Sequence, residues 1–334
     1  MKVLVLGGNR YIGLHLVFEL ARQGHEVTVF NSHVAPMPPG TRRLHGDRRQ
    51  PGVIEEVLTP VRDEFDAVFD NTSFTPDDMR PVVDMFRGRV KHFIFTSSIA
   101  VYLQSDTQPI AEDFPVSDDE QTGLFGSYGA DKVRCERILA REQAENGLPY
   151  TVVRVSHSCG PMSPLPTREP GTFTRLEQAR PLLLAGDVGA NIHVVHIQDV
   201  ARLMCAILGN ERAIGQIYNA AGSQFCTIAA YMRLMAKTVG VTPNIVTMPR
   251  GIGMKSPVVH WLEARHGGMA FSIEKARRDL GWEPSFTLES ALADSYRWFV
   301  EEGRDRYTIE FSDDDAIIAE MARRGEPVPG AHVA

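Results

Sequence analysis

Short apolar runs alternate with helical patterns along the first half of the chain, and this alternation constrains the fold more than any other feature. The runs are almost continuously apolar, which is typical of parallel strands covered on both faces. The stretches between them have helical periodicity, and two of them end at a glycine, Gly24 and Gly147. The alternation predicts an α/β fold with a doubly wound parallel sheet. The five runs are KVLVL (2–6), EVTVF (26–30), DAVFD (66–70), HFIFTS (92–97) and TVVRVS (151–156).

The second half of the chain is less regular. Residues 161–171 are rich in proline and polar side chains, so we expect a loop or lid there. Two further strands are expected, and the second of them is expected to return to the sheet. The predicted elements are strands at 191–197 and 216–222 and helices at 198–209, 227–239 and 286–302.

The first run leads directly into a glycine-rich turn and a helix, in the sequence VLVLGGNRYIG from Val3 to Gly13. Backbone N–H groups at a helix start point outward, and the helix dipole favours a negative group there. The pattern that binds a dinucleotide's phosphates has glycine at three places. Gly7 and Gly13 fill the outer two, and Arg10 takes the middle one. Because the motif lies on the first strand of the alternation, it predicts a Rossmann-type NAD(P) site.

The residues after the second run determine which cofactor is expected. NAD sites usually have an acidic residue there, which binds the adenosine ribose, whereas this chain has Asn31 followed by Ser32. A carboxylate would repel a 2′-phosphate, but Asn31, Ser32 and the nearby Arg10 would accept one. The sequence therefore favours NADP over NAD, with NAD left open. The expected contacts in this part of the site are Gly7, Asn9, Arg10, Tyr11, Ile12, Gly13, Asn31, Ser32, Asp47 and Arg48, with Asp47 accepting from the adenine amine.

A hydroxyl cluster and a Tyr-x-x-x-Lys motif indicate redox chemistry. The stretch FIFTSSIAVY (93–102) ends a predicted strand in three hydroxyl residues, and SYGADK (127–132) opens a long helix. Tyr128 and Lys132 are four residues apart, so they lie on one helix face. A lysine ammonium favours the phenolate, and such a tyrosine can exchange the proton of a secondary alcohol while a nicotinamide exchanges hydride. A neighbouring serine hydroxyl can hold the substrate oxygen.

In this order, these motifs resemble the extended short-chain dehydrogenase/reductases, the NAD(P)-dependent epimerase/dehydratase group. The resemblance extends over nearly the whole chain and includes GGNRYIG, TSSIAVY, YGADK, VHIQDVARLM, GQIYNAAG and RRDLGWEPSFTLESAL. It implies a Rossmann domain with a smaller substrate domain, and a homodimer built on the long helix that holds Tyr128. The expected division is 1–155 plus 189–222 for the cofactor, 156–188 plus 223–325 for the substrate, and a tail at 326–334.

The resemblance also implies site residues. Ser98, Tyr128 and Lys132 match the family's catalytic positions, and Lys132 would also hold the nicotinamide ribose. His157 follows the run TVVRVS (151–156), and it is expected to face the substrate together with Ser98 and Tyr128. The further cofactor contacts that the resemblance implies are Asn71, Thr72, Ser73, Thr96 and Ser156.

Departures from the family pattern narrow the expected reaction. TSSIA lacks the acid and base that drive the elimination of water in 4,6-dehydratases, so a dehydratase is disfavoured. Nucleotide-sugar epimerases usually have asparagine where this chain has His157. The arginine-containing glycine turn looks most like an atypical subgroup that includes chloroplast stem-loop RNA-binding proteins.

Charge and composition disfavour other classes of protein. A net charge of −7 argues against a nucleic-acid partner. No apolar run approaches the roughly 20 residues that span a membrane, and no signal peptide is evident. The four cysteines lack the spacing of a metal site, so we expect no metal, and buried free thiols in a reducing cytoplasm.

Three functions remain open at this point. The leading one is a nucleotide-sugar epimerase that acts on a secondary alcohol. The second is an NADPH-dependent ketone reductase or alcohol dehydrogenase. The third is a non-redox RNA-binding protein on the same scaffold, which the net charge and the intact Ser-Tyr-Lys set disfavour.

Overall fold

The computed structural model describes residues 1–122, 125–184, 189–248 and 268–327. The chain divides into two compact units. Unit 1 consists of residues 1–158, 195–223 and 271–285, and unit 2 of residues 159–194, 224–270 and 286–334. Within the described residues, no helix is both long and apolar enough to cross a membrane.

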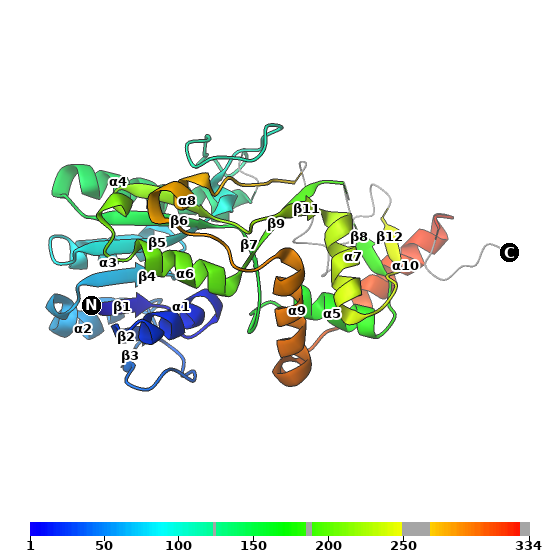
Figure 1. Ribbon diagram of the computed structural model, residues 1–334, viewed down its shortest axis with the longest axis horizontal. Helices are drawn as coiled ribbons and strands as arrows, with labels where there is room; N and C mark the ends of the chain where they lie inside the picture. Colours follow the sequence, from blue (N-terminus) through cyan, green and yellow to red (C-terminus); the bar gives the residue numbers. More distant parts are fainter. Residues whose placement is uncertain (123–124, 185–188, 249–267, 328–334) are drawn as a thin grey trace. The chain divides into compact units, whose positions relative to one another are not determined.

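Unit 1 is built on a seven-stranded parallel sheet, which confirms the predicted α/β fold (Figure 1). The spatial order is β10-β6-β5-β4-β1-β2-β3, so the order of connection reverses between β1 and β4. The ligand crevice of an open α/β sheet forms at such a reversal, outside the carboxyl ends of the strands. The strands are β1 (Lys2–Leu6), β2 (Glu26–Asn31), β3 (Arg42–His45), β4 (Ala67–Asp70), β5 (His92–Ser98), β6 (Tyr150–Val155) and β10 (Gln216–Ala220).

Helices cover both faces of this sheet (Figure 1). α1 packs against α6, and α3 packs against α4 and α2. Short 3₁₀ segments join several elements. The helical segments of unit 1 are α1 (Tyr11–Arg22), α2 (Val53–Leu58), η1 (Thr59–Glu64), α3 (Pro76–Phe86), η2 (Ile99–Val101), α4 (Gly126–Asn146), α6 (Ile197–Ile207), η3 (Glu211–Ala213) and α8 (Glu274–Leu280).

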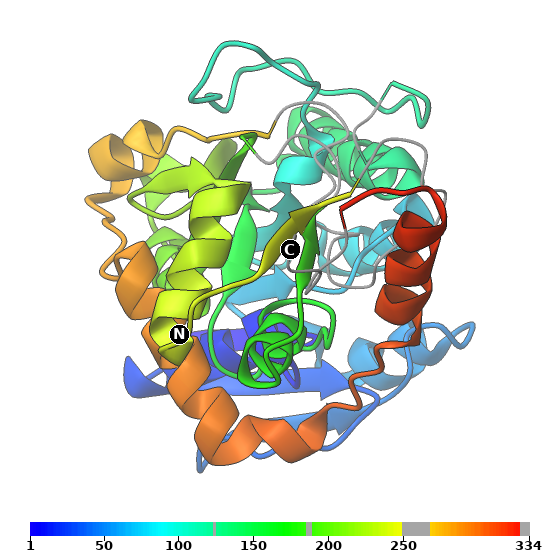
Figure 2. The same cartoon turned by 90° about the vertical axis from the view of Figure 1, so that its right-hand side faces the viewer.

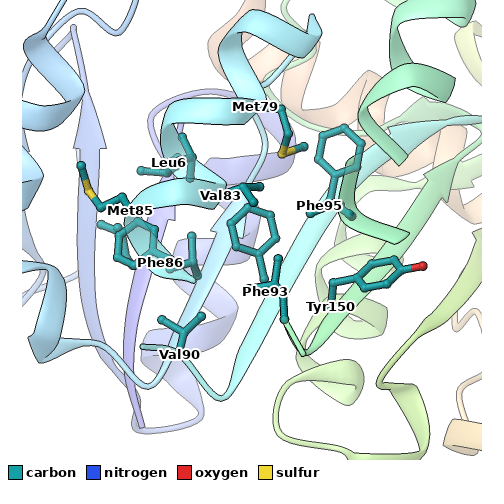
Figure 3. Close-up of a cluster of buried hydrophobic side chains, with 14 of the residues drawn as sticks. Leu6, Met79, Val83, Met85, Phe86, Val90, Phe93, Phe95 and Tyr150 are labelled. Atoms are coloured by element: carbon teal, nitrogen blue, oxygen red, sulfur yellow. The ribbon is translucent and has the colours of Figure 1, made fainter. Parts of the chain in front are cut away.

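The core beneath α3 explains why the first half of the sequence is so apolar. Val83 and Phe86 of α3 pack with Phe93 and Phe95 of β5, and all four side chains are buried (Figure 3). Burying a phenylalanine or valine side chain contributes about 1.5–3 kcal/mol. This burial holds β4 and β5 in register and so fixes the two strand ends from which the site is built.

Unit 2 is a cluster of helices with several short strands. Phe173 of α5, Tyr231 of α7 and Trp298 of α9 share one apolar core, and Figure 2 shows α7 and α9 side by side. β8 pairs with β12 in parallel, and β9 pairs antiparallel with β11. The elements are α5 (Glu169–Glu177), β8 (Leu182–Leu184), β9 (Asn191–His196), β11 (Phe225–Thr227), α7 (Ile228–Val239), β12 (Ile245–Thr247), α9 (Leu288–Trp298), the π-helical η4 (Phe299–Gly303), η5 (Arg304–Arg306) and α10 (Ser312–Arg323), with β7 (His157–Cys159) spanning the boundary with unit 1.

The observed units differ from the predicted domains at residues 156–158, 189–194, 223 and 271–285. Residues 271–285 lie in unit 1, because Trp282 Nε1 donates to the Asp199 carbonyl at 3.2 Å and the Phe271 ring stacks on Tyr102. Residues 189–194 lie in unit 2, where His193 pairs with Phe225 of β11. The expected loop at 161–171 ends in the first turn of α5. Most of the expected tail, residues 328–334, lies outside the described part of the chain.

Candidate functional site

The glycine turn between β1 and α1 has a geometry that requires both of its outer glycines. Gly7 has a φ of +81°, a value that side chains rarely tolerate. A Cβ on Gly13 would lie 1.9 Å from the carbonyl oxygen of Gly7, so α1 can start this close to β1 only without a side chain there. The turn therefore presents its backbone, and the start of α1, at the carboxyl end of β1.

Arg10 occupies the middle position of the motif without strain. Its φ of −139° and ψ of 144° are extended, and its side chain is exposed and makes no capping hydrogen bond to α1. A glycine is therefore not needed there for backbone reasons. Asn9 Nδ2 donates to the His33 carbonyl at 3.3 Å, which ties the turn to the loop after β2. Tyr11 and Ile12 form the first turn of α1, and Tyr11 is buried.

The end of β2 carries the residues expected to distinguish NADP from NAD. Asn31 is the last residue of β2, and its buried amide nitrogen makes no hydrogen bond within the described residues. Ser32 Oγ lies 2.8 Å from His33 Nδ1. Asp47 is held by Arg49, whose side-chain hydrogen bonds lower the pKa of Asp47 to about 2. The Asp47 carboxylate is therefore ionised at neutral pH and can act only as an acceptor.

The guanidinium of Arg48, a predicted cofactor contact, has several partners within unit 1. It reaches the end of β4, where it contacts Asp70 Oδ1 at 3.2 Å and Thr72 Oγ1 at 2.6 Å. The Arg48 side chain is 10% exposed, and the Asp70 side chain is fully buried. The Nε of the same guanidinium is buried and has no hydrogen-bond partner among the described residues, so these bonds leave one of its donors unused.

Lys132 lies at the centre of the site. Its ammonium donates to the carbonyl of Ser73, after β4, at 2.8 Å and to the carbonyl of Thr96, in β5, at 2.9 Å. It also lies 4.6 Å from the centre of the Phe95 ring and 5.0 Å from that of Phe74. The lysine is 2% exposed, and burial lowers its pKa from 10.5 to about 8. The ammonium form is thus still dominant at neutral pH, in a place where its charge is poorly screened.

Ser98 and Tyr128 lie on two turns that pack together. Ser98 is the last residue of β5, and its hydroxyl accepts from the backbone N–H of Ala100 at 3.2 Å, which starts η2. Tyr128 lies in the first turn of α4 and is 41% exposed. A Cβ on the next residue, Gly129, would lie 2.4 Å from the carbonyl oxygen of Ala100. The glycine of YGADK therefore lets the turn of Tyr128 approach the turn of Ser98, a role the sequence reasoning missed.

A buried ion pair connects α4 to the sheet. Glu136 Oε2 accepts from Arg154 Nη2 of β6 at 2.7 Å, and Glu136 Oε1 accepts from Ser97 Oγ at 2.6 Å. Glu136 lies four residues after Lys132, so both face the sheet. The sequence analysis missed this pair, although the i, i+4, i+8 spacing from Tyr128 is visible in the sequence.

The remaining predicted residues lie at the carboxyl ends of β4, β5 and β6. Thr96 Oγ1 donates to Asn71 Oδ1 at 2.6 Å. Asn71 Nδ2 and Ser156 Oγ are buried and make no hydrogen bond with any described residue. Together with Asn31 Nδ2, they are polar atoms of the kind that a bound dinucleotide satisfies. His157 starts β7 and is partly buried. Residues 1–122, 125–184, 189–248 and 268–327 contain no group of three potential metal ligands.

Comparison with known proteins agrees with this arrangement. The family model described as "NAD dependent epimerase/dehydratase family" matches residues 3–221. The chloroplast stem-loop binding protein of 41 kDa b of Arabidopsis thaliana is 29% identical, over 95% of this chain and 84% of that protein. The UDP-glucose 4-epimerase of Bacillus subtilis is 24% identical, over 89% of this chain and 96% of the epimerase.

Solved structures share the fold. The UDP-glucose 4-epimerase of Thermus thermophilus, in complex with NAD, superposes with a TM-score of 0.74 at 20% identity, over 90% of this chain and 100% of that chain. The UDP-glucuronic acid 4-epimerase of Bacillus cereus, also in complex with NAD, gives a TM-score of 0.73 at 18% identity, over 91% and 98%. The family match spans well over half of the chain and includes the glycine turn, Ser98, Tyr128 and Lys132. The chain belongs to the NAD-dependent epimerase/dehydratase family of enzymes.

Proposed function

We propose that this protein is an NAD(P)-dependent epimerase of a nucleotide-linked sugar, which inverts a secondary alcohol through a ketone. The observation that carries the proposal is the position of the Lys132 ammonium. It is held on the carbonyls that follow β4 and lie within β5, one helical turn after Tyr128. A positive charge fixed one helical turn from Tyr128 supports a role for that tyrosine in proton exchange with a substrate hydroxyl.

Each of the three catalytic residues would have a separate task. The phenolate of Tyr128 takes the proton from the substrate hydroxyl, and the phenol so formed returns it when the ketone is reduced. The charge of Lys132 favours the phenolate, because an ammonium one turn away stabilises a negative oxygen. Ser98 orients the substrate oxygen by a hydrogen bond. A bound nicotinamide supplies the chemistry of hydride transfer.

The cofactor would be held by the glycine turn and the strand ends. The N–H groups at the start of α1 suit the diphosphate, and Asn71 and Ser156 each have a buried polar atom for the rest of the dinucleotide. Asn31 in place of a carboxylate, with Arg10 exposed beside the turn, supports NADP over NAD. His157 is proposed to face the substrate.

The same adenosine end favours a second candidate, an NADPH-dependent ketone reductase. An epimerase regenerates its cofactor in every turnover, whereas a reductase consumes NADPH. The residues Asn31 and Ser32, which would admit a 2′-phosphate, are therefore the specific observation on the side of a reductase. The homodimer expected on α4 stays a prediction.

The decisive experiment combines cofactor analysis with turnover. The purified protein is denatured, released nucleotides are identified by mass spectrometry, and UDP-sugars are assayed for C4 inversion with NAD⁺ and NADP⁺. Inversion without net change in cofactor supports the epimerase, and stoichiometric NADPH consumption with a ketone supports the reductase. Stem-loop RNA binding without turnover of either kind would contradict both.

The Tyr128→Phe variant tests the catalytic assignment. Removing a general acid–base group lowers turnover by about 100-fold or more. Tyr296→Phe is the matched control, because Tyr296 donates to Glu177 in unit 2 and has no part in the proposed chemistry. Equal activities of the two variants would show that Tyr128 is not catalytic.

A further inference from the structure

Arg48, with a side chain 10% exposed, and the fully buried Asp70 form an ion pair next to the proposed cofactor site. Arg48 follows β3, and Asp70 is the last residue of β4. The Arg48 guanidinium also donates to Ser73 Oγ at 3.0 Å and to the carbonyl of Asp78, in the first turn of α3, at 2.6 Å. One side chain thus connects the loop after β3, the end of β4 and the start of α3.

Asp70 shapes the segment that follows β4. Its Oδ1 accepts from the backbone N–H groups of Thr72 and Ser73, each at 2.9 Å, and its Oδ2 accepts from Ser73 Oγ at 2.5 Å. These bonds fold the backbone back on the aspartate, as aspartate side chains do in turns. An ionised carboxylate without a partner would be costly in this buried position, and Arg48 supplies the opposite charge.

The segment shaped in this way contacts both halves of the proposed machinery. Thr72 packs over the glycine turn so closely that a Cβ on Gly7 would lie 2.1 Å from Thr72 Cγ2. The carbonyl of Ser73 accepts from the Lys132 ammonium. A change in the backbone of Thr72 and Ser73 would therefore move the side chain that packs against Gly7. It would also move one of the two carbonyls that accept from Lys132.

We propose that Arg48 and Asp70 form a positioning pair that sets the Thr72–Ser73 backbone, and through it both the glycine turn and the Ser73 anchor of Lys132. Arg48 thus acts on cofactor binding and proton transfer through this segment rather than as a ligand. The inference deepens the proposed function and rests on it for its catalytic part. Its structural part concerns only contacts within unit 1.

The first test is backbone hydrogen exchange across residues 71–75, which needs neither cofactor nor substrate. The Arg48→Met and Asp70→Asn variants are compared with Arg80→Met and Asp77→Asn. These two control residues form an exposed Arg–Asp pair on α3, 3.5 Å apart. We expect exchange of the 71–75 amides to be about tenfold faster or more in the first two variants, because local opening becomes easier, and unchanged in the controls. Wild-type exchange in Arg48→Met would overturn the proposal.

The second test distinguishes positioning from general loss of stability. Arg48→Lys keeps the charge but loses the planar fork that reaches several acceptors. The double variant Arg48→Met/Asp70→Asn removes both charges, so no buried ion is left unpaired. We expect the double variant to recover the melting temperature of the wild type. Its Kd for NAD⁺ and NADP⁺ should stay about tenfold or more higher than that of the wild type. Its kcat should fall by up to about 100-fold, since small misplacements of reacting groups cost that much. Full recovery of cofactor affinity in the double variant would show that the pair only stabilises the fold.

The third test follows kcat as a function of pH. Substitutions of Arg48 and of Asp70 should shift the pKa of Lys132 in opposite directions. Burial lowers the pKa of Lys132 most; the negative charges of Asp70 and Glu136 raise it, and the positive charge of Arg48 lowers it further. Arg48→Met should therefore move the titration of Lys132 to higher pH, and Asp70→Asn should move it to lower pH. A shift in the same direction for both variants would contradict the proposed geometry. A wild-type protein that binds neither cofactor would overturn the proposed function, and the exchange experiment would still decide the structural part.

Discussion

The substitution Lys132→Met is expected to stabilise the fold at neutral pH while it abolishes turnover. Lys132 is 2% exposed, and burial lowers its pKa from 10.5 in the unfolded chain to about 8 in the folded protein. Since the folded state binds this proton less tightly than the unfolded chain does, the charged lysine opposes folding wherever it is protonated. The buried charge of Lys132 therefore lowers the free energy of unfolding, and it is kept because the proposed reaction needs it.

The size of this cost follows from the two pKa values. A difference of about 2.5 units corresponds to about 3 kcal/mol at pH 7, where both states are largely protonated. The cost falls as the pH rises through 8 toward 10.5, and by pH 10 about 1 kcal/mol remains. Methionine leaves the carbonyls of Ser73 and Thr96 without their donor, which costs about 1 kcal/mol each at every pH. The net gain at pH 7 is then about 1 kcal/mol.

The assay is urea unfolding of the cofactor-free protein at several pH values between 7 and 10. As the pH rises from 7 to 10, the free energy of unfolding of the wild type should increase by about 2 kcal/mol relative to that of Lys132→Met. Lys91→Met is the control for the loss of a surface lysine, because Lys91 is exposed and pairs with Asp66 at 2.8 Å. A difference between wild type and Lys132→Met that stays constant, or that changes in favour of the variant as the pH rises, would refute the reasoning.

Three further predictions concern the same unit. His92 is buried, and burial lowers its pKa from 6.5 to about 4. It therefore contributes about 3 kcal/mol of stability above pH 6.5, which is lost as the pH falls toward 4. In thermal melts, His92→Gln should flatten the dependence of stability on pH between 6.5 and 4. Gly13→Ala forces its Cβ against the Gly7 carbonyl, so calorimetry should show loss of cofactor binding and a fold weakened by about 1–3 kcal/mol, and wild-type affinity would contradict the turn geometry. Arg10→Ala should weaken NADP binding about tenfold more than NAD binding, because one charged hydrogen bond to the phosphate is lost, and equal effects on the two cofactors would exclude a phosphate role.

Strands with continuous burial were predictable, and the exposed edge strand β3 was not. β1, β4 and β5 are covered on both faces, so nearly every residue is apolar and the pattern is clear. β3 has the sequence RRLH and is mostly exposed, because it pairs with β2 on one side only. Polar residues carry no periodic signal of burial, so its boundaries could be determined only from the backbone pairing.

Some features of the candidate site were likewise predictable from the sequence, and others were not. The glycine turn and the Tyr-x-x-x-Lys motif were predictable, because each depends on local spacing along the chain. The partners of Arg48 were not, since Asp70 and Asp78 are 22 and 30 residues away and meet it only after the sheet has formed. The partners of Glu136 were missed for the same reason.

The sequence by itself determined the parallel sheet, the phosphate turn and the helix that presents Tyr128 and Lys132, because these features follow from burial patterns and short-range spacing. Only the tertiary structure decided that Arg48 clasps the end of β4, that Lys132 is anchored on two carbonyls, and that residues 271–285 belong with the sheet. The physical reason is that hydrogen bonds and ion pairs between distant segments depend on distances in space, and chain order does not encode those distances until the core is packed.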